Sequence, residues 1–217
     1  MTDSRDHGKA LKASDLATLG LLVALEQDEA VTQRGLSARI GVALGLTNSL
    51  IKRAVIKGMV KVHQVPAKRI GYYVTPKGFT EKSRLVAQYL SASLSFFRKA
   101  REEYSVVFAQ VRAQNRSRIA LFGEGELAEI ALLSAQADGV TIDAIIHPGS
   151  NKDEFAGIPV INNLDLIEAH DFDGIVITAS NTPQEAYDLM VLHMGSEHVF
   201  AVPLLHVNND KNRKVPQ

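Results

Sequence analysis

Apolar residues recur at helical spacing in three stretches near the start of the chain. The predicted helices cover residues 14–27, 33–40 and 43–57. Ser14 or Asp15 can cap the first helix and Thr32 the second, because their side-chain oxygens accept hydrogen bonds from free backbone N–H groups. Gly58 can end the third, since glycine takes the left-handed conformation that commonly follows a helix.

Two strands are predicted next, residues 59–65 and 70–74, joined by a turn at residues 66–69. Three helices and a hairpin with a basic tip, in this order, predict a winged helix-turn-helix domain over residues 14–78. Residues 1–13 are polar and mixed in charge, and we expect them to form a disordered tail.

A long amphipathic helix is predicted from Phe79 to Val111, and we take residues 79–112 as a linker and dimerisation helix. It is longer than a small winged domain needs to cover its own core, so it either packs on the next domain or pairs with a second copy. Pairing is expected, because helix-turn-helix proteins usually read two-fold DNA sites as dimers. Charged residues at Phe97 and Tyr104 should then give monomers.

Strand and helix patterns alternate through the rest of the chain. Predicted strands cover residues 118–122, 141–146, 157–161, 174–178 and 198–202. Helices are predicted up to about residue 137, after a cap at Asn163, and from Thr182-Pro183 onward, where proline suits the first helical position. This order predicts a doubly wound parallel sheet, Rossmann-like, over residues 118–207, and therefore a two-domain α/β protein.

Charge divides the chain at about residue 117, although the whole chain has no net charge. Residues 1–117 hold 19 Lys and Arg against 9 Asp and Glu, which leaves +10, so the remaining residues carry −10. Such asymmetry indicates a module that binds nucleic acid, joined to one with another task. A winged helix can also serve as a protein-contact module.

The third helix is expected to enter the major groove of double-stranded DNA, while the wing touches the backbone or the minor groove. Asparagine can pair with adenine and arginine with guanine, and lysine can do the same or neutralise phosphate. The predicted DNA-binding residues are Gln33, Arg34, Asn48, Ser49, Lys52, Arg53, Lys68 and Arg69.

Four segments of the first half carry a family resemblance: Val31–Gly41, Leu44–Lys52, Lys57–Lys61 and Tyr72–Gly78. Through these segments, roughly residues 15–105 resemble the exopolysaccharide-associated branch of MarR-type regulators. The resemblance implies that Gln33, Arg34, Asn48 and Lys52 face DNA. Leu46 stands where that branch usually has lysine, and Ala43 where it usually has a capping serine.

A glycine motif opens the second half, Gly123-x-Gly125-x-x-Ala128, between a predicted strand and a predicted helix. Gly123 permits a tight turn, and Gly125 lets a phosphate approach the helix N-terminus. The acid that usually holds a ribose is replaced by His147, so NAD(H) is less expected. The predicted ligand-binding residues are Gly123, Gly125, Glu126, Leu127, His147, Ser180 and Asn181. A relic of the fold with no ligand is the alternative.

Four features of the same half carry a second resemblance: the Gly-x-Gly start, the strand that begins at Gly157, the helix that follows it and the Ser180-Asn181 corner. In these features the half is similar to the nucleotide-sugar-binding domain of amino-sugar acyltransferases and to the related domain of sugar-nucleotide dehydratases. This resemblance implies a nucleotide sugar as the ligand. A winged helix before such a domain is also similar to Rex-type redox sensors.

Composition narrows the possible functions. The chain has no cysteine, which excludes disulfides and zinc–thiolate sites. Its longest apolar run, Leu19–Leu25, is far below the roughly 20 residues of a membrane span, so a cytoplasmic protein is expected. The second half has no Tyr-x-x-x-Lys dyad, and the sequence has no nucleophile elbow, no Walker loop and no histidines at metal-ligand spacing, so no enzyme and no metal site are predicted.

The sequence therefore predicts a dimeric transcriptional regulator that binds DNA and senses a small phosphorylated ligand. The alternative is a nucleotide-sugar enzyme or enzyme accessory in which the winged helix is a protein-interaction module. A third possibility is an architectural DNA-binding protein that has no ligand.

Overall fold

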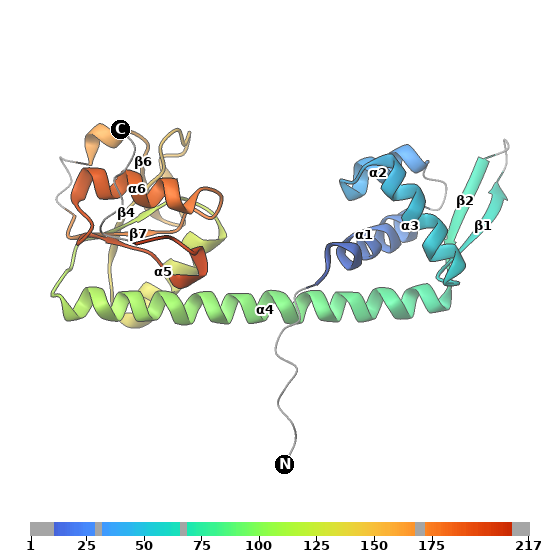
Figure 1. The fold of residues 1–217 in the computed structure, drawn as a ribbon, viewed down its shortest axis with the longest axis horizontal. Helices are drawn as coiled ribbons and strands as arrows, with labels where there is room; N and C mark the ends of the chain where they lie inside the picture. The colour runs from blue at the N-terminus through green and yellow to red at the C-terminus, as the bar shows by residue number, and fades with distance from the viewer. Residues whose placement is uncertain (1–10, 29–31, 66–68, 168–171, 210–217) are drawn as a thin grey trace, which may run out of the picture. The chain divides into compact units, whose positions relative to one another are not determined.

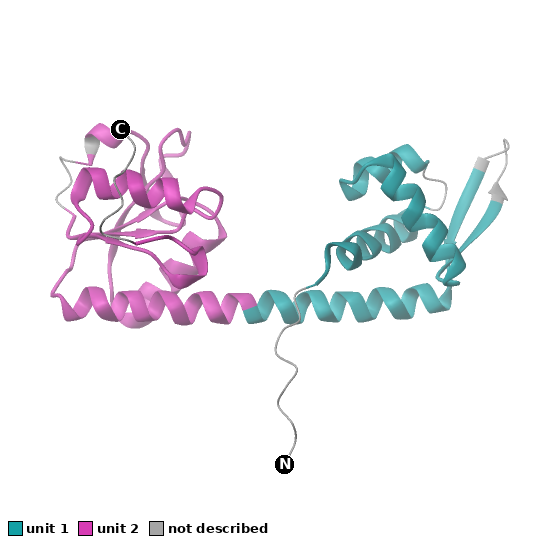
Figure 2. Cartoon of the chain, viewed as in Figure 1, with its two compact units in different colours: residues 1–95 teal, residues 96–217 magenta. Residues whose placement is uncertain are grey.

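The computed structural model describes residues 11–28, 32–65, 69–167 and 172–209. The chain divides into two compact units, residues 1–95 and 96–217 (Figure 2). The division falls inside the helix α4 (Pro76–Ala113), so that one helix contributes to both units. Among the described helices, none has both the length and the apolar composition needed to cross a bilayer.

The first unit contains three helices followed by an antiparallel hairpin (Figure 1), as the sequence predicts for a winged helix-turn-helix. The elements are α1 (Ala13–Gln27), α2 (Gln33–Ile40), α3 (Leu44–Ile56), β1 (Val60–Val65) and β2 (Arg69–Val74). Their apolar faces enclose one core. It is built of Leu21, Leu22, Ala24, Leu25, Leu36, Leu50, Ile51, Ala54, Met59, Val60, Tyr72 and Val74.

The helix caps in this unit agree in part with those predicted from the sequence. The Thr32 hydroxyl accepts a hydrogen bond from the Gly35 N–H at 3.1 Å, as predicted, and Gly58 has a φ of +72°. The predicted cap at Ser14 or Asp15 is wrong, because the helix already begins at Ala13 with Lys12 in the cap position. Asp15 lies within the first turn instead, where its carboxylate complements the helix dipole.

Helix α4 begins at Pro76, earlier than the predicted Phe79, because the segment before Phe79 forms a cap. The Thr75 hydroxyl accepts a hydrogen bond from the Gly78 N–H at 3.1 Å and donates one to the Gly58 carbonyl at 2.7 Å. A Cβ at Gly78 would lie 2.2 Å from the Met59 carbonyl oxygen, so only glycine fits there. The threonine, proline and glycine therefore start the helix and fix it against the hairpin.

The second unit is built around a six-stranded sheet with the order β5-β6-β4-β3-β7-β8. Every neighbouring pair is parallel except β5 with β6. The strands are β3 (Ile119–Phe122), β4 (Ile142–Ile146), β5 (Glu154–Phe155), β6 (Ile158–Ile161), β7 (Gly174–Ile177) and β8 (Val199–Phe200). Helix α5 (Glu126–Asp138) connects β3 to β4, and α6 (Pro183–Met194) connects β7 to β8. This unit is thus a mixed α/β layer structure with a largely parallel sheet.

Three details of this unit differ from the sequence prediction. Strand β5 was not predicted. In place of the helix expected after Asn163, the residues described up to Ile167 form a 3₁₀ turn, Leu164–Leu166, which Asn163 caps by accepting the Asp165 N–H. The last strand stops at Phe200, because the segment before Pro203 leaves the sheet and a second 3₁₀ turn follows, Pro203–Leu205.

The C-terminal part of α4 belongs to the core of the second unit. Its buried residues are Ala100, Tyr104, Val107, Phe108 and Val111, all at most 5% exposed. The Tyr104 hydroxyl donates a hydrogen bond to the Ile177 carbonyl of β7 at 3.2 Å. The expectation that Tyr104 lies between two copies is therefore wrong, because this residue is used within its own chain.

Candidate functional site

Helix α3 presents two opposite faces. Thr47, Leu50, Ile51 and Ala54 are buried. The outermost row on the other side is Gly45, Ser49, Lys52 and Ile56, one helical turn apart and all exposed. The Ser49 hydroxyl hydrogen-bonds the Gly45 carbonyl at 3.0 Å, so Lys52 is the strongest hydrogen-bond donor of this row.

The predicted residues of α2 lie at its start. Gln33 and Arg34 are both exposed, in the first turn of the helix. The Gln33 side-chain amide donates a hydrogen bond to the Tyr72 hydroxyl of β2 at 3.0 Å, which fixes its direction relative to the hairpin. Arg39, at the other end of α2, pairs with Asp28 at 3.4 Å.

Asn48 points outward less than the sequence suggests. The residue is half-buried, and its Oδ1 atom is buried with no hydrogen-bond partner among the described residues. It sits on the flank of α3 rather than in the outermost row, because the helical twist carries it about 60° toward the core. Sequence spacing alone could not separate a flanking position from an outermost one.

Arg53 lies on the opposite flank, away from the hairpin. It lines a cavity of about 390 Å³ in the first unit together with Lys57 and Arg84. The other lining residues are Leu11, Lys12, Ser14, Asp15 and Gln88. Arg84 makes two hydrogen bonds to the Glu81 carboxylate, at 2.7 and 2.8 Å, and this pairing lowers the Glu81 pKa. Arg53 therefore shares a basic recess with α1 and α4 rather than a surface with Lys52.

The predicted wing residues are only partly described. Lys68 lies outside the described residues, and so does the side chain of Arg69, whose backbone begins β2. The remaining DNA-facing candidates gather on α2 and α3: Gln33, Arg34, Ser49 and Lys52.

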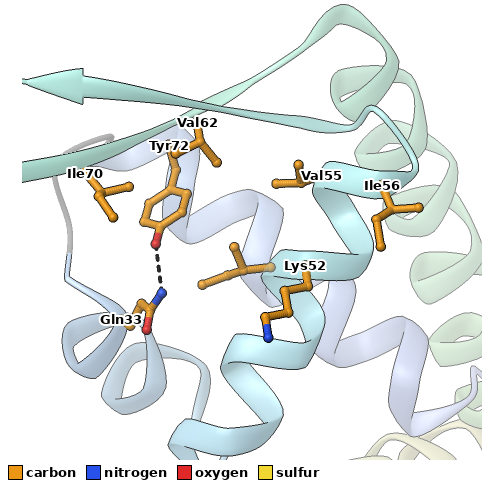
Figure 3. Close-up of a pocket in the computed structure, with 8 residues that line it drawn as sticks. Gln33, Lys52, Val55, Ile56, Val62, Ile70 and Tyr72 are labelled. Atoms are coloured by element: carbon orange, nitrogen blue, oxygen red, sulfur yellow. Dashed lines mark hydrogen bonds between the residues drawn. The ribbon is translucent and has the colours of Figure 1, made fainter.

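A groove lies between α3 and the hairpin, and sequence reasoning missed it. We call it the α3–hairpin groove; its volume is about 370 Å³. It is lined by Gln33, Ile51, Lys52, Val55, Ile56, Val62, Ile70 and Tyr72 (Figure 3). Ile56 is 85% exposed, and Val62 and Ile70 are about half exposed. The sequence does contain a signal for this groove. Val55 and Ile56 are apolar residues near the end of the third predicted helix, and Val62 and Ile70 are apolar residues on one side of the two predicted strands.

The glycine motif of the second unit forms the turn between β3 and α5. Gly123 has a φ of +108°, and a Cβ there would lie 2.6 Å from the Ala179 backbone nitrogen. Only glycine therefore allows β3 and the end of β7 to come this close. Gly125 has a φ of +127° and faces open space, with nothing within 4 Å of its added Cβ.

Three side chains that follow β4, those of His147, Ser150 and Lys152, interact with Glu124 in this turn. The Glu124 backbone N–H donates a hydrogen bond to His147 Nδ1 at 3.1 Å. The Glu124 carboxylate pairs with Lys152 at 2.5 Å and lies 3.8 Å from His147 Nδ1. Hydrogen bonds from Lys152 and then Ser150 hold the pKa of Glu124 below its ordinary value. Sequence reasoning named His147 but missed Lys152 and Ser150, which the turn after β4 brings back.

The other predicted ligand residues are divided between surface and core. Glu126 and the neighbours Ser180 and Asn181 are exposed at the carboxyl ends of β3 and β7. Leu127 is buried, and its side chain packs in the core of the second unit. Among the described residues, no three His, Asp or Glu side chains gather as a metal site requires.

Comparisons with known proteins give only partial likenesses. No family model matches the sequence, and no curated protein matches it. CouR from Rhodococcus jostii RHA1, solved with p-coumaroyl-CoA, is 25% identical over 38% of this chain and 57% of its own, with a TM-score of 0.32. The match thus spans little more than half of CouR.

Two further solved structures are similar at the same level. The PcaV transcriptional regulator from Streptomyces coelicolor is 20% identical over 49% of this chain and 76% of its own, with a TM-score of 0.36. PigF with SAH is 16% identical over 87% of this chain and 72% of its own, with a TM-score of 0.33. Likenesses with TM-scores below 0.5 do not establish what this chain does.

Proposed function

We propose that the chain is a cytoplasmic transcriptional regulator that binds double-stranded DNA. The observation that carries the proposal is the excess charge of +10 in residues 1–117, which contain the helix-turn-helix and its outward row on α3. DNA is a polyanion, and a basic domain of this architecture neutralises its phosphates while one helix enters the major groove. The second half, at −10, cannot serve this purpose.

In this proposal the contacts divide between α2 and α3. Lys52 projects from the outermost row of α3, where it can reach a guanine edge or a phosphate. Arg34 lies in the first turn of α2, at the end of the helix where a phosphate is favoured. Gln33 is already held by Tyr72, so it would reach DNA without losing much side-chain freedom. Lys68 and Arg69 would extend the contact through the wing.

The direct test is the salt dependence of duplex binding. Fluorescence anisotropy should show an affinity for DNA that falls steeply as salt rises. The double variant Arg34→Met/Lys52→Met should weaken binding and lower the slope of log K against log salt by about 1 for each phosphate that is no longer neutralised. Arg98→Met, an exposed arginine on α4, is the matched control and should change neither. Absence of duplex affinity at low salt would refute the proposal.

We also propose that the regulator is a homodimer through the middle of α4. An exposed stretch of apolar residues runs along this part of the helix: Val86, Tyr89, Leu90, Leu94 and Phe96, each 36–59% exposed. Contiguous apolar surface of this kind favours a protein contact. A second copy is the occupant that a two-fold DNA site calls for.

The second unit, in our proposal, is a Rossmann-like domain that senses a nucleotide sugar of polysaccharide metabolism. Support comes from the strand order, since β4 and β7 flank β3 on opposite sides and ligands bind parallel sheets where the order reverses. Gly125 faces open space at this edge, and Ser180 and Asn181 are exposed beside it. A phosphate would compete with Glu124 for Lys152. NAD(H) is less favoured, because His147, and not an acid, stands directly after β4.

A thermal-shift screen of nucleotides and nucleotide sugars tests this part. A ligand at about 100 times its Kd adds roughly 2.7 kcal/mol of apparent stability. Asn181→Ala should reduce the shift, and Gln136→Ala on the exposed side of α5 should not. A variant with a side chain at Gly125 is unsuitable, because a φ of +127° strains any other residue. If nothing in the panel raises the Tm, the sensing role fails while DNA binding stands.

One observation favours the alternative of a nucleotide-sugar enzyme or accessory with a protein-binding winged helix. The α3–hairpin groove is mostly apolar, whereas surfaces that meet DNA are usually polar and basic. The DNA titration separates the two functions, because a protein-binding module has no reason to bind duplex DNA with a steep salt dependence.

A further inference from the structure

The Glu124 carboxylate is enclosed by hydrogen-bond donors, although it stands in a turn at the edge of the sheet. The Lys152 ammonium donates to it at 2.5 Å, and the Ser150 hydroxyl donates a second hydrogen bond. Only 11% of the Glu124 side chain is exposed. A carboxylate withdrawn from water needs such donors to replace its hydration. Glu124 is therefore bound here in the way that a site for anions binds its ligand.

His147 adds a third group beside the carboxylate. The Glu124 backbone N–H donates to its Nδ1 atom at 3.1 Å, so Nδ1 offers a lone pair and carries no proton. The ring is then neutral with its proton on Nε2, and the 3.8 Å between Nδ1 and the Glu124 carboxylate is not an ion pair. The Nε2–H is a further donor. We call Ser150, Lys152 and His147 the anion cage.

The anion cage is held in place without help from Glu124. The Asn162 side-chain amide donates to the Ser150 carbonyl at 3.4 Å, and the Lys152 backbone N–H donates to the Ser150 hydroxyl at 3.2 Å. The Lys152 ammonium also lies 5.2 Å from the centroid of the Phe155 ring, in a cation–π contact. These contacts do not involve the carboxylate, so the cage is preorganised for another anion.

A phosphate can reach the anion cage from the glycine turn. Helix α5 begins next to Glu124, with Gly125 in the cap position and no side chain capping its N–H groups. This end of the helix favours negative charge. Nothing lies within 4 Å of a Cβ added to Gly125, which leaves room for the entering group and for the displaced carboxylate.

We propose that the anion cage is the phosphate subsite of the second unit, and that Glu124 occupies it until a ligand phosphate displaces the carboxylate. The inference rests on the proposed function in one respect, that the ligand carries a phosphate. An internal occupant lowers the apparent affinity by the fraction of molecules in which the cage is empty. Glu124 thus sets the ligand concentration to which the second unit responds.

The test uses inorganic pyrophosphate on the full chain at constant ionic strength. Residues 1–117 carry +10 and attract the same anion, so binding is followed by the amide NMR signals of Gly125 and Ser150. Glu124→Gln keeps the shape of the side chain and removes its charge. It should bind pyrophosphate about two- to fivefold more tightly, the range expected for one exposed ion pair. Glu129→Gln, in the same first turn of α5, is the matched control and should leave the affinity unchanged.

A second substitution separates displacement from simple repulsion. Lys152→Met should weaken binding of pyrophosphate about two- to fivefold, whereas Arg118→Met, at the opposite end of β3, should not. In the Lys152→Met background, Glu124→Gln should bring no further gain, because the carboxylate no longer withholds the ammonium. An equal gain in both backgrounds would show that Glu124 only repels the anion and would overturn the proposal. Signals of Gly125 and Ser150 that do not respond to pyrophosphate in any variant would overturn it as well.

The panel of nucleotide sugars distinguishes this inference from the proposed function. A nucleotide sugar that binds the native protein and Glu124→Gln equally would refute displacement and leave the sensing role intact. Tighter binding of pyrophosphate by Glu124→Gln, without a response to any nucleotide sugar, would refute the nucleotide sugar and leave the anion cage in place.

Discussion

Two stretches of the single helix α4 carry the same apolar pattern and meet different surroundings. Residues 100–111 pack one face against the sheet of the second unit, and the five apolar residues of that face are at most 5% exposed. Residues 86–96, about one to four turns before residue 100, keep apolar side chains 36–59% exposed. Helical spacing therefore predicts which residues share a face but does not predict what covers that face.

The buried stretch carries a polar group that its neighbours satisfy. Tyr104 donates its hydroxyl proton to the Ile177 carbonyl, and burial raises the pKa of its phenol well above the ordinary value. The ring of Phe108 stacks beside it, with centroids 6.4 Å apart. Tyr89, in the exposed stretch, has a side chain that is 48% exposed.

The largest expected effect is that of a charge at the centre of the buried stretch. Tyr104→Asp should cost about 4 kcal/mol or more in the free energy of unfolding, because a large buried side chain is removed and a carboxylate is buried without a partner. The matched control is Val106→Asp, two residues away and 58% exposed, which should change stability by less than about 0.5 kcal/mol. Denaturant unfolding followed by circular dichroism measures both. A folded Tyr104→Asp protein that has only lost its dimer would contradict this assignment.

The exposed stretch should respond in the opposite way. Leu90→Glu/Leu94→Glu should leave the fold intact, since both side chains are more than half exposed, and should convert a dimer into a monomer. DNA affinity should fall as well, because linked half-sites reinforce one another. Analytical ultracentrifugation at micromolar concentration measures the change, and Val106→Glu on another side of the helix is the control. Sedimentation of the native chain as a monomer would remove the proposed dimer.

A smaller effect is expected where α4 holds the end of the second unit. The Glu103 carboxylate accepts the Leu204 N–H at 2.6 Å and lies 3.8 Å from the Lys99 ammonium. Glu103→Gln retains an acceptor but loses the charge, so it should cost about 1 kcal/mol of stability. The exposed neighbour provides the control, Glu102→Gln, which should have almost no effect. Equal stability of the two variants would show that the hydrogen bond to Leu204 contributes nothing.

Elements whose signal lies within a short segment could be predicted from the sequence. Thr32 caps α2 through a hydrogen bond to a residue three positions away, and Gly58 takes the left-handed conformation after α3. The start of α4 was placed three residues late, because the role of Gly78 depends on the Met59 carbonyl, which is distant in sequence. The short strand β5 could not be predicted for the same reason, since it exists only by pairing with β6.

The candidate sites were harder to predict, because side-chain direction depends on tertiary packing. Asn48 and Lys52 are equally polar in the sequence, yet Asn48 is half-buried and Lys52 is exposed. Lys152 reaches Glu124 only because the chain returns after β4 to the turn at Gly123. The α3–hairpin groove requires a helix and two strands to meet, and no local pattern contains that information.

The position of α4 in the chain has a consequence for synthesis. The ribosome makes residues 100–111 before any strand of the sheet that will cover them, and the last strand, β8, follows about 90 residues later. Translation adds about 5–20 residues per second, so the apolar face of the helix stays uncovered for roughly 5 to 20 s before the last strand is made. The first unit has its complete core by then and can fold. A nascent chain at this stage therefore exposes one uninterrupted apolar face from Val86 to Val111, and chaperones or a second nascent chain meet it before the sheet does.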